Sequence, residues 1–302
     1  GREGASIQFG GSIGNWLGKL AHLDEFDHHV MIMCGMSAAF AAVFGTPMAA
    51  AVFAMEVASV GVMYYAALLP CVIAAIIAAE FATGMGIDPE TFPVHSIPGL
   101  TVETGLKMAL IAVGCGILSI LFCILLKIVG QLYTKYLKNP YIRIVVAAGV
   151  IILITICLNT KDYMGAGSGL IARAIENGEA GPLDFLWKML LTALTMRAGY
   201  RGGEIVPAFS VGATFGCVAG GILGFSPELA AAAGMVALFC GVTNCPITAM
   251  LISFELFGFS GAAYYLIAIS ISYAVSGYYS LYKDQTIVYS KYKARYINRK
   301  TR

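Results

Sequence analysis

Two stretches of the sequence combine glycines with one carboxylate, each at the expected start of an apolar helix. The first is Gly1-Arg2-Glu3-Gly4, and the second is Gly202-Gly203-Glu204, followed by Ile205-Val206-Pro207. The first turn of a helix leaves N–H groups unpaired and carries a partial positive charge, so it attracts anions. Two such starts in one apolar chain predict a shared anion site, in which a carboxylate can take the place of the anion.

Each of the two carboxylates has a structural and a functional interpretation. An acid such as Glu3 in the first turn stabilises a helix by about 0.3–1 kcal/mol through the helix dipole. As a gate, ionised Glu3 would fill the anion site, and protonated Glu3 would swing away and admit the anion. Glu204 lies between long apolar stretches, where an unpaired charge is costly to bury, so function is favoured there. The N–H groups of Ile205 and Val206 would then face the site.

The composition indicates a membrane protein. Hydrophobic residues make up 59% of the 302 residues and charged residues 12%, against about 25% charged residues in an average soluble domain. Several charge-free runs reach the roughly 20 residues that span a bilayer as a helix. We therefore expect an all-α polytopic membrane protein. Several expected helices are too short to cross alone, and such broken helices line cavities in transporters.

Enzymatic, metal-binding and nucleic-acid-binding functions find no support in the sequence. His28-His29 beside Asp27 fits no metal-ligand set, and the eight cysteines include no Cys-x-x-Cys pair. The run Gly165-Ala166-Gly167-Ser168-Gly169 does not match the Gly-x-Ser-x-Gly pattern of a nucleophile elbow. The tail 291–302 holds six basic residues and no acid, which places the C-terminus on the cytoplasmic side. We expect no catalytic residues, no metal and no cofactor.

A Pro- and Gly-rich stretch at 83–101 divides the chain into two halves, 1–100 and 101–285, followed by a basic tail at 286–302 that we expect to be helical. Because the sequence starts without Met inside a motif, the first half is interpreted as N-terminally incomplete. The expected helices are 5–20, 30–44, 47–57, 64–82, 102–137, 141–158, 183–195, 207–223, 227–242, 246–257 and 261–282, with a loop at 22–29.

The halves repeat each other at a nearly constant offset. Glu3 matches Glu204, 201 residues later. The matched glycines, 202 residues apart, are Gly10, Gly14 and Gly18 with Gly212, Gly216 and Gly220. Pro47 and Glu56 match Pro246 and Glu255, 199 residues later. The repeat is either inverted or parallel, and an inverted one would bring the two helix starts to one anion. Glu56 and Glu255 are interpreted as helix caps or anchors near a membrane face, or as proton relays.

Four motifs resemble the CLC family of chloride channels and anion/proton antiporters, in the family's order and over essentially the whole chain. They are Gly1-Arg2-Glu3-Gly4 with Gln8, Phe44-Gly45-Thr46-Pro47, Gly202-Gly203-Glu204-Ile205-Val206-Pro207 and Val288-Tyr289-Ser290. The resemblance implies an inverted repeat and a homodimer in the cell membrane, with one anion pathway per subunit.

The resemblance also implies roles for residues. It places the gating glutamate on Glu3, the anion-coordinating amides on Ile205 and Val206, and the anion-coordinating tyrosine on Tyr289. The full set of expected anion-binding residues is Arg2, Gly4, Ala5, Gly203, Glu204, Ile205, Val206 and Tyr289. Glu3 and Glu204 form the expected proton pathway.

Glu204 indicates which branch of the family the chain resembles. Chloride-handling members usually carry an apolar residue there, followed by Phe where Ile205 stands, whereas Gly-Gly-Glu-[Ile/Val]-x-Pro is similar to the fluoride-exporting branch. Val57 stands where chloride/proton exchangers carry an inner proton glutamate. The fluoride branch lacks this glutamate, so Val57 is consistent with that branch. The resemblance implies export of fluoride in exchange for protons. The alternative is a chloride/proton antiporter or a voltage-gated-type chloride channel.

Overall fold

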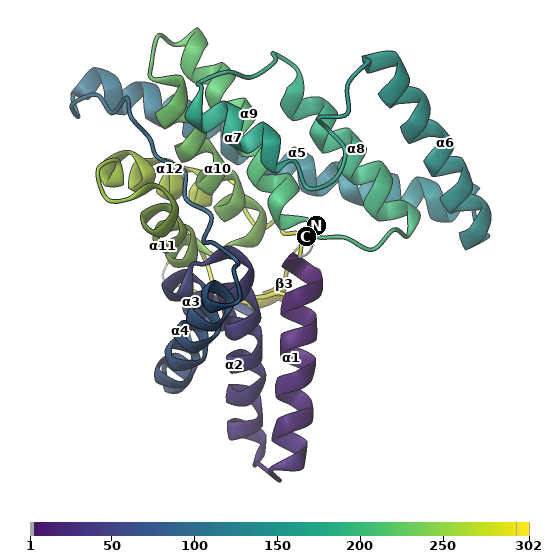
Figure 1. Ribbon diagram of the computed structural model, residues 1–302, viewed down its shortest axis with the longest axis vertical. Helices are drawn as coiled ribbons and strands as arrows, with labels where there is room; N and C mark the ends of the chain where they lie inside the picture. The colour runs from purple at the N-terminus through teal and green to yellow at the C-terminus, as the bar shows by residue number, and fades with distance from the viewer. Residues whose placement is uncertain (1–2, 294, 302) are drawn as a thin grey trace.

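The computed structural model describes residues 3–293 and 295–301, and only the backbone of Glu3. The described residues are mainly helical, as predicted (Figure 1). The first half holds α1 (Glu3–Leu20), α2 (Glu25–Phe44), α3 (Pro47–Glu56), a 3₁₀ turn (Tyr65–Ala67) and α4 (Leu68–Gly84). The second half holds α5 (Val102–Tyr136), α6 (Pro140–Leu158), α7 (Ser168–Glu176), α8 (Asp184–Ala198), α9 (Ile205–Ile222), α10 (Pro227–Thr243), α11 (Pro246–Phe257) and α12 (Ala262–Val275). Three short strands are β1 (Ser59–Val60), β2 (Thr286–Tyr289) and β3 (Tyr296–Lys300).

Five of these helical segments are long and apolar enough to cross a membrane: α2, Tyr65–Gly84, α5, α6 and α9. Four shorter apolar helices, α3 and α10 to α12, lie among them. The expected polytopic all-α architecture with short helices is therefore confirmed. Helix α10 is buried on all sides from Leu229 to Thr243 and contacts α5, α7, α9, α11 and α12. An entirely apolar helix is stable in such a central position.

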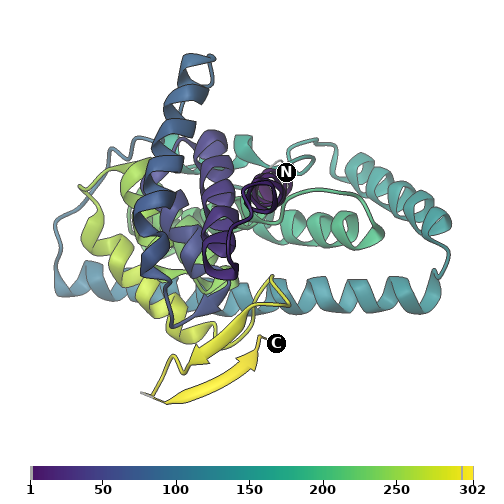
Figure 2. The ribbon, with the colours of Figure 1, turned by 90° about the horizontal axis from the view of Figure 1, so that it is seen from below.

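Three boundary predictions were wrong. The helix expected over 261–282 ends at Val275, and residues 276–282 form turns and loop. The expected loop at 22–29 ends early, because the Asp24 side chain accepts a hydrogen bond from the N–H of Asp27 at 2.8 Å and caps α2. The tail is not helical: β2 pairs in parallel with β1 and antiparallel with β3 (Figure 2). The β2 sequence Thr-Ile-Val-Tyr favours a strand, and β1 supplies a partner from more than 200 residues away.

The predicted repeat is visible in two matched helix hairpins. Helix α1 packs on α2 through its glycines, and α9 packs on α10 in the same way. A Cβ added at Gly10 would lie 2.2 Å from the carbonyl oxygen of Gly35, and one at Gly212 would lie 2.4 Å from that of Gly234. Small residues four apart allow backbones to approach this closely in membrane proteins. The glycine pattern therefore fixes the same hairpin twice.

Helices α3 and α11 show how the repeats are oriented. The Glu56 carboxylate, at the end of α3, accepts hydrogen bonds from the N–H groups of Ile247 (3.1 Å) and Thr248 (2.9 Å) at the start of α11. Near the end of α11, the Glu255 carboxylate accepts from the N–H groups of Met48 (2.8 Å) and Ala49 (2.9 Å) at the start of α3. The two equivalent helices thus run antiparallel, which fits an inverted repeat and leaves the parallel alternative without support.

The two halves also share one aromatic cluster. Phe40 of α2 and Phe53 of α3 stack with ring centroids 5.0 Å apart, and Phe53 lies 6.3 Å from Phe239 of α10. Phe209 of α9 lies 5.1 Å from Phe239 and 6.1 Å from Phe44. Because such ring pairs contribute beyond simple area burial, this cluster holds the start of α9 against the first half.

The glycine packing predicts a position-specific cost of a single methyl group. A Cβ at Gly216 would lie 2.1 Å from the backbone oxygen of Ala230, whereas a Cβ at Gly221, on the same helix, meets nothing within 4 Å. We expect Gly216→Ala to destabilise the protein by about 1–3 kcal/mol through overpacking and Gly221→Ala to leave it unchanged. Thermal unfolding in detergent measures both; equal melting temperatures for the two variants would contradict the assigned packing.

Candidate anion site at two helix N-termini

The starts of α1 and α9 meet in space, although about 200 residues separate them in the chain (Figure 1). A Cβ added at Gly4 would lie 3.7 Å from the Cα of Gly203, so the two backbones are in near contact. A cavity of about 530 Å³, here called the site cavity, opens between them. Its lining residues are Gly4, Ala5, Gln8, Met196, Arg197, Gly199, Tyr200, Arg201, Gly202, Gly203, Glu204, Ile205 and Tyr282.

Most of the predicted anion-binding residues lie at this cavity. Gly4 and Ala5 come from the first turn of α1, and Gly203, Glu204 and Ile205 come from the start of α9. Val206 is the next residue of α9 and is buried, outside the lining. Glu3 is the first residue of α1, and its side chain lies outside the described part of the structure, as does the whole of Arg2.

The structure places Tyr289 away from the site cavity. It lies in β2 with its side chain 48% exposed, and its ring contacts Tyr296 at a centroid distance of 5.8 Å. Tyr282, seven residues earlier in the loop after α12, lines the cavity instead. Its phenol hydroxyl can donate a hydrogen bond to an anion.

Glu204 does not cap the helix that it precedes. It occupies the N-cap position of α9, but its side chain makes no capping hydrogen bond. The carboxylate instead pairs with Arg197, with 3.2 Å between Oε1 and Nη2. The side chains of Arg197 and Glu204 are 26% and 19% exposed, so the pair is mostly shielded from water. The first turn of α9 is therefore left without a side-chain cap.

Sequence reasoning missed both Arg197 and Tyr282. Arg197 lies in the last turn of α8, and the loop 199–203 turns back to bring Glu204 beside it. The sequence signal was a single arginine after an apolar run, seven residues before the carboxylate. Tyr282 had no comparable signal, because Tyr278 and Tyr279 precede it and no spacing distinguishes one tyrosine from another.

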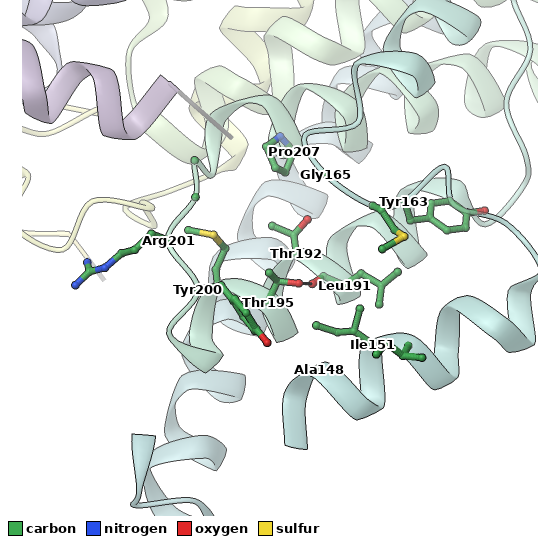
Figure 3. A pocket seen from close by; sticks show the side chains of 15 residues that line it. Ala148, Ile151, Tyr163, Gly165, Leu191, Thr192, Thr195, Tyr200, Arg201 and Pro207 are labelled. Atoms are coloured by element: carbon green, nitrogen blue, oxygen red, sulfur yellow. Dashed lines mark hydrogen bonds between the residues drawn. The ribbon is translucent and has the colours of Figure 1, made fainter. Parts of the chain in front are cut away.

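A second cavity, of about 320 Å³, lies on the other side of the loop 199–203 (Figure 3). It opens between α6 and α8, with Ala148 and Ile151 opposite Leu191 and Thr195, while the Arg201 side chain points away from the other labelled side chains. The two cavities share five lining residues: Met196, Tyr200, Arg201, Gly202 and Gly203. This glycine-containing loop is therefore a thin wall between two hollow spaces.

Glu56 and Glu255 lie outside the site cavity and serve as caps. Glu56 is 6% exposed and also accepts a hydrogen bond from the Thr248 hydroxyl at 2.6 Å, so both of its oxygens are occupied. A carboxylate held by three donors at the start of α11 stabilises the helix directly. Among the described residues, no group of three His, Cys, Asp or Glu side chains could hold a metal ion.

Short apolar helices, an inverted repeat and two helix starts that meet at one cavity are features typical of polytopic membrane transport proteins. The family model described as "Voltage gated chloride channel" matches residues 1–277. The chain therefore belongs to this family, the CLC family of channels and exchangers.

Known relatives place the chain more closely. A protein of Pseudomonas syringae pv. tomato named "Chloride/fluoride channel protein" is 33% identical over 301 residues, covering 97% of this chain and 66% of that protein. The "H(+)/Cl(-) exchange transporter ClcA" of Vibrio cholerae is 29% identical over 273 residues, covering 85% of this chain and 58% of that protein. The chain thus spans roughly three fifths to two thirds of the length of these relatives, which are named transporters and channels rather than enzymes.

Solved structures confirm the fold. A crystal structure of a CLC-type fluoride/proton antiporter matches with a TM-score of 0.90 and 33% identity, covering 94% of this chain and 72% of that one. A slow cyanobacterial Cl⁻/H⁺ antiporter matches with a TM-score of 0.74 and 19% identity, over 91% of this chain and 68% of that one. At 19% identity, the second likeness is one of fold alone.

The geometry of Glu56 predicts a structural rather than a transport phenotype. In Glu56→Gln, an amide N–H₂ would face a backbone N–H, leaving a buried donor unsatisfied at a cost of about 1–3 kcal/mol. We expect a lower melting temperature and an unchanged ratio of protons to anions transported per folded molecule. Glu80→Gln, at an exposed position on α4, is the matched control. Normal stability with altered proton coupling would instead support the relay interpretation.

Proposed function

We propose that the protein is a secondary antiporter that exports fluoride in exchange for protons. The observation that carries this proposal is the position of the Glu204 carboxylate where the starts of α1 and α9 meet. It does not cap α9 and pairs instead with Arg197. The names of the Pseudomonas relative and of the fluoride/proton antiporter structure support the same choice of anion. A chloride/proton antiporter or chloride channel remains the second candidate, favoured by the chloride in the name of the Vibrio relative.

The site suits a small anion that is costly to dehydrate. Fluoride is a strong hydrogen-bond acceptor, so a site must replace its water with good donors. Two helix starts supply backbone N–H groups and partial positive charge. The phenol of Tyr282 and the guanidinium of Arg197 add side-chain donors at the same cavity. In this proposal, protonated Glu204 donates a hydrogen bond to the anion through its O–H group. Ionised Glu204 cannot donate, so the anion is then bound only by the backbone N–H groups and the neighbouring side chains.

Glu3 is the gate in this proposal. Its position as the first residue of α1 places its backbone one residue before Gly4, at the wall of the site cavity. When ionised, it competes with the anion for the helix starts; when protonated, it releases them and carries a proton. Alternating occupation by carboxylate and fluoride would couple the two fluxes, with Glu3 and Glu204 as the proton pathway.

The assembly and orientation complete the proposal. We place the protein in the cell membrane as a homodimer with one anion pathway per subunit, in contact with the lipid bilayer and with a cytoplasmic C-terminus. Basic residues gather on the side where α5 ends, at Lys127, Lys135, Lys138 and Arg143, which supports this orientation.

The decisive experiment measures fluoride, chloride and proton fluxes from proteoliposomes with ion-selective electrodes and a pH probe. We expect fluoride efflux coupled to proton uptake, with far slower chloride efflux. Glu204→Gln keeps the shape of the side chain but removes its ability to ionise and to donate through a hydroxyl. We expect it to reduce coupled fluoride exchange by at least about tenfold, the equivalent of 1.4 kcal/mol.

Two results would contradict the proposal in different ways. Chloride efflux without fluoride efflux would favour the chloride alternative. Fluoride–proton exchange by Glu204→Gln at the wild-type rate would remove Glu204 from the mechanism. Wild type and Glu204→Gln share every other residue of the cavity lining, Gln8 included, so any difference in flux is due to the carboxylate.

A further inference from the structure

A third cavity, here called the basic vestibule, lies between the second half of α5, the end of α8, the segment 279–283 and the end of β3. Its volume is about 710 Å³. Four cationic side chains line it: Lys127, Arg197, Lys283 and Lys300. No Asp or Glu lines it among the described residues. A hollow lined by charges of one sign raises the local concentration of the opposite ion, in a manner that salt screens.

Two acidic side chains pair with lining residues without lining the vestibule themselves: Glu204 with Arg197, and Asp284 with Lys300. Asp284 pairs with Lys300 at 2.9 Å, but its side chain is 97% exposed and the pair is at the surface. Exposed pairs of this kind interact weakly, so Lys300 still contributes to the positive field. Lys127 and Lys283 are also exposed and therefore reachable by dissolved anions.

Arg197 belongs to both the basic vestibule and the site cavity. Met196 is the other residue that they share, and it is apolar. The stem of Arg197 lies against α5, because a Cβ added at Gly130 would be 3.4 Å from Arg197 Cδ. The guanidinium is thus the charged group that the linings of the two cavities share. Its aliphatic stem packs against α5 at Gly130, which has no side chain.

The guanidinium has donors to spare. It carries five N–H bonds in a planar fork, and Glu204 accepts one of them at 3.2 Å. The Nε–H is buried and has no hydrogen-bond partner in the described part of the chain. An unpaired donor in a low-dielectric setting favours any acceptor that can reach it. A small anion arriving from the vestibule is such an acceptor.

We infer that Arg197 is the residue through which anions pass from the basic vestibule into the site cavity, first binding its free donors and then displacing Glu204 from it. This inference rests on the anion transport proposed above and adds a route to the site. The Glu204–Arg197 ion pair closes the junction, and the arriving anion opens it by taking the place of the carboxylate on the guanidinium. The lysines of the vestibule steer the anion to this point.

A sided transport measurement separates this role from a structural one. Right-side-out and everted membrane vesicles containing the full-length protein expose its two faces in turn, and fluoride flux is measured against fluoride concentration at each face. We expect Arg197→Met to raise the apparent KM about tenfold or more at the vestibule face and to leave it within about twofold at the opposite face. Arg197→Lys keeps the charge but loses the fork, and we expect about a threefold rise at the vestibule face.

Two further variants complete the design. Lys135→Met removes a basic residue of the same helix α5 outside the vestibule lining and should leave both KM values unchanged. Lys127→Met with Lys283→Met should raise the KM at the vestibule face and weaken its dependence on ionic strength. This pair of substitutions carries the test if Arg197→Met does not fold.

Two other outcomes for Arg197→Met overturn the inference. Wild-type KM values at both faces in Arg197→Met would show that anions do not use the guanidinium. An equal rise at both faces would assign Arg197 a structural role. If wild-type vesicles move chloride but not fluoride, the fluoride proposal fails on its own, and the same sided comparison with chloride still decides the role of Arg197.

Discussion

The structure depends on one electrostatic constraint: two helix starts with unpaired N–H groups face each other inside an apolar bundle. Their partial positive charges repel unless something negative lies between them. A carboxylate or an anion satisfies both at once, and the apolar surroundings make that interaction stronger than it would be in water. Glu204 is the N-cap residue of α9 but makes no side-chain capping hydrogen bond, so its carboxylate is placed to respond to whichever negative group is present.

The packing of the bundle holds the two starts in place. Glycine contacts fix the α1–α2 and α9–α10 hairpins, and reciprocal carboxylate caps fix α3 against α11. The same device appears once in each half, so each half positions one helix start. Phenylalanine rings from both halves then fill the space behind the site. An inverted repeat of this kind explains why equivalent residues converge on one cavity rather than forming two separate sites.

Residue spacing was enough to predict most of the helices, the repeat and the meeting of α1 with α9. The glycines at intervals of four lie on one helix face, and the Pro–Glu pairs nine residues apart mark the two ends of a short helix. Both are local features, so they can be recognised in the sequence. The tail was different. The motif around Tyr289 is three residues long, and the chain after Val275 is positioned by pairing with a strand more than 200 residues away. A short motif could not reveal that Tyr282, rather than Tyr289, lines the cavity.

The Arg197–Glu204 pair and the cavities were equally beyond the sequence. Arg197 ends one helix and Glu204 precedes the next, and only the turn of the loop between them joins the two charges. A cavity depends on side chains from several helices, so no local pattern reports it. The placement of an arginine at the junction of two cavities is therefore information that the folded chain alone provides.

The most direct test of the account is a fluoride binding titration of the full-length protein by isothermal titration calorimetry, comparing wild type with Gly4→Ala and Gly4→Asp. A Cβ at Gly4 makes only an ordinary contact, 3.7 Å from Gly203, so Gly4→Ala should bind fluoride as wild type does. Gly4→Asp retains the backbone N–H but introduces a fixed carboxylate between the helix starts, and it should lose saturable fluoride binding. Wild-type binding by Gly4→Asp would show that the anion does not occupy the space between α1 and α9.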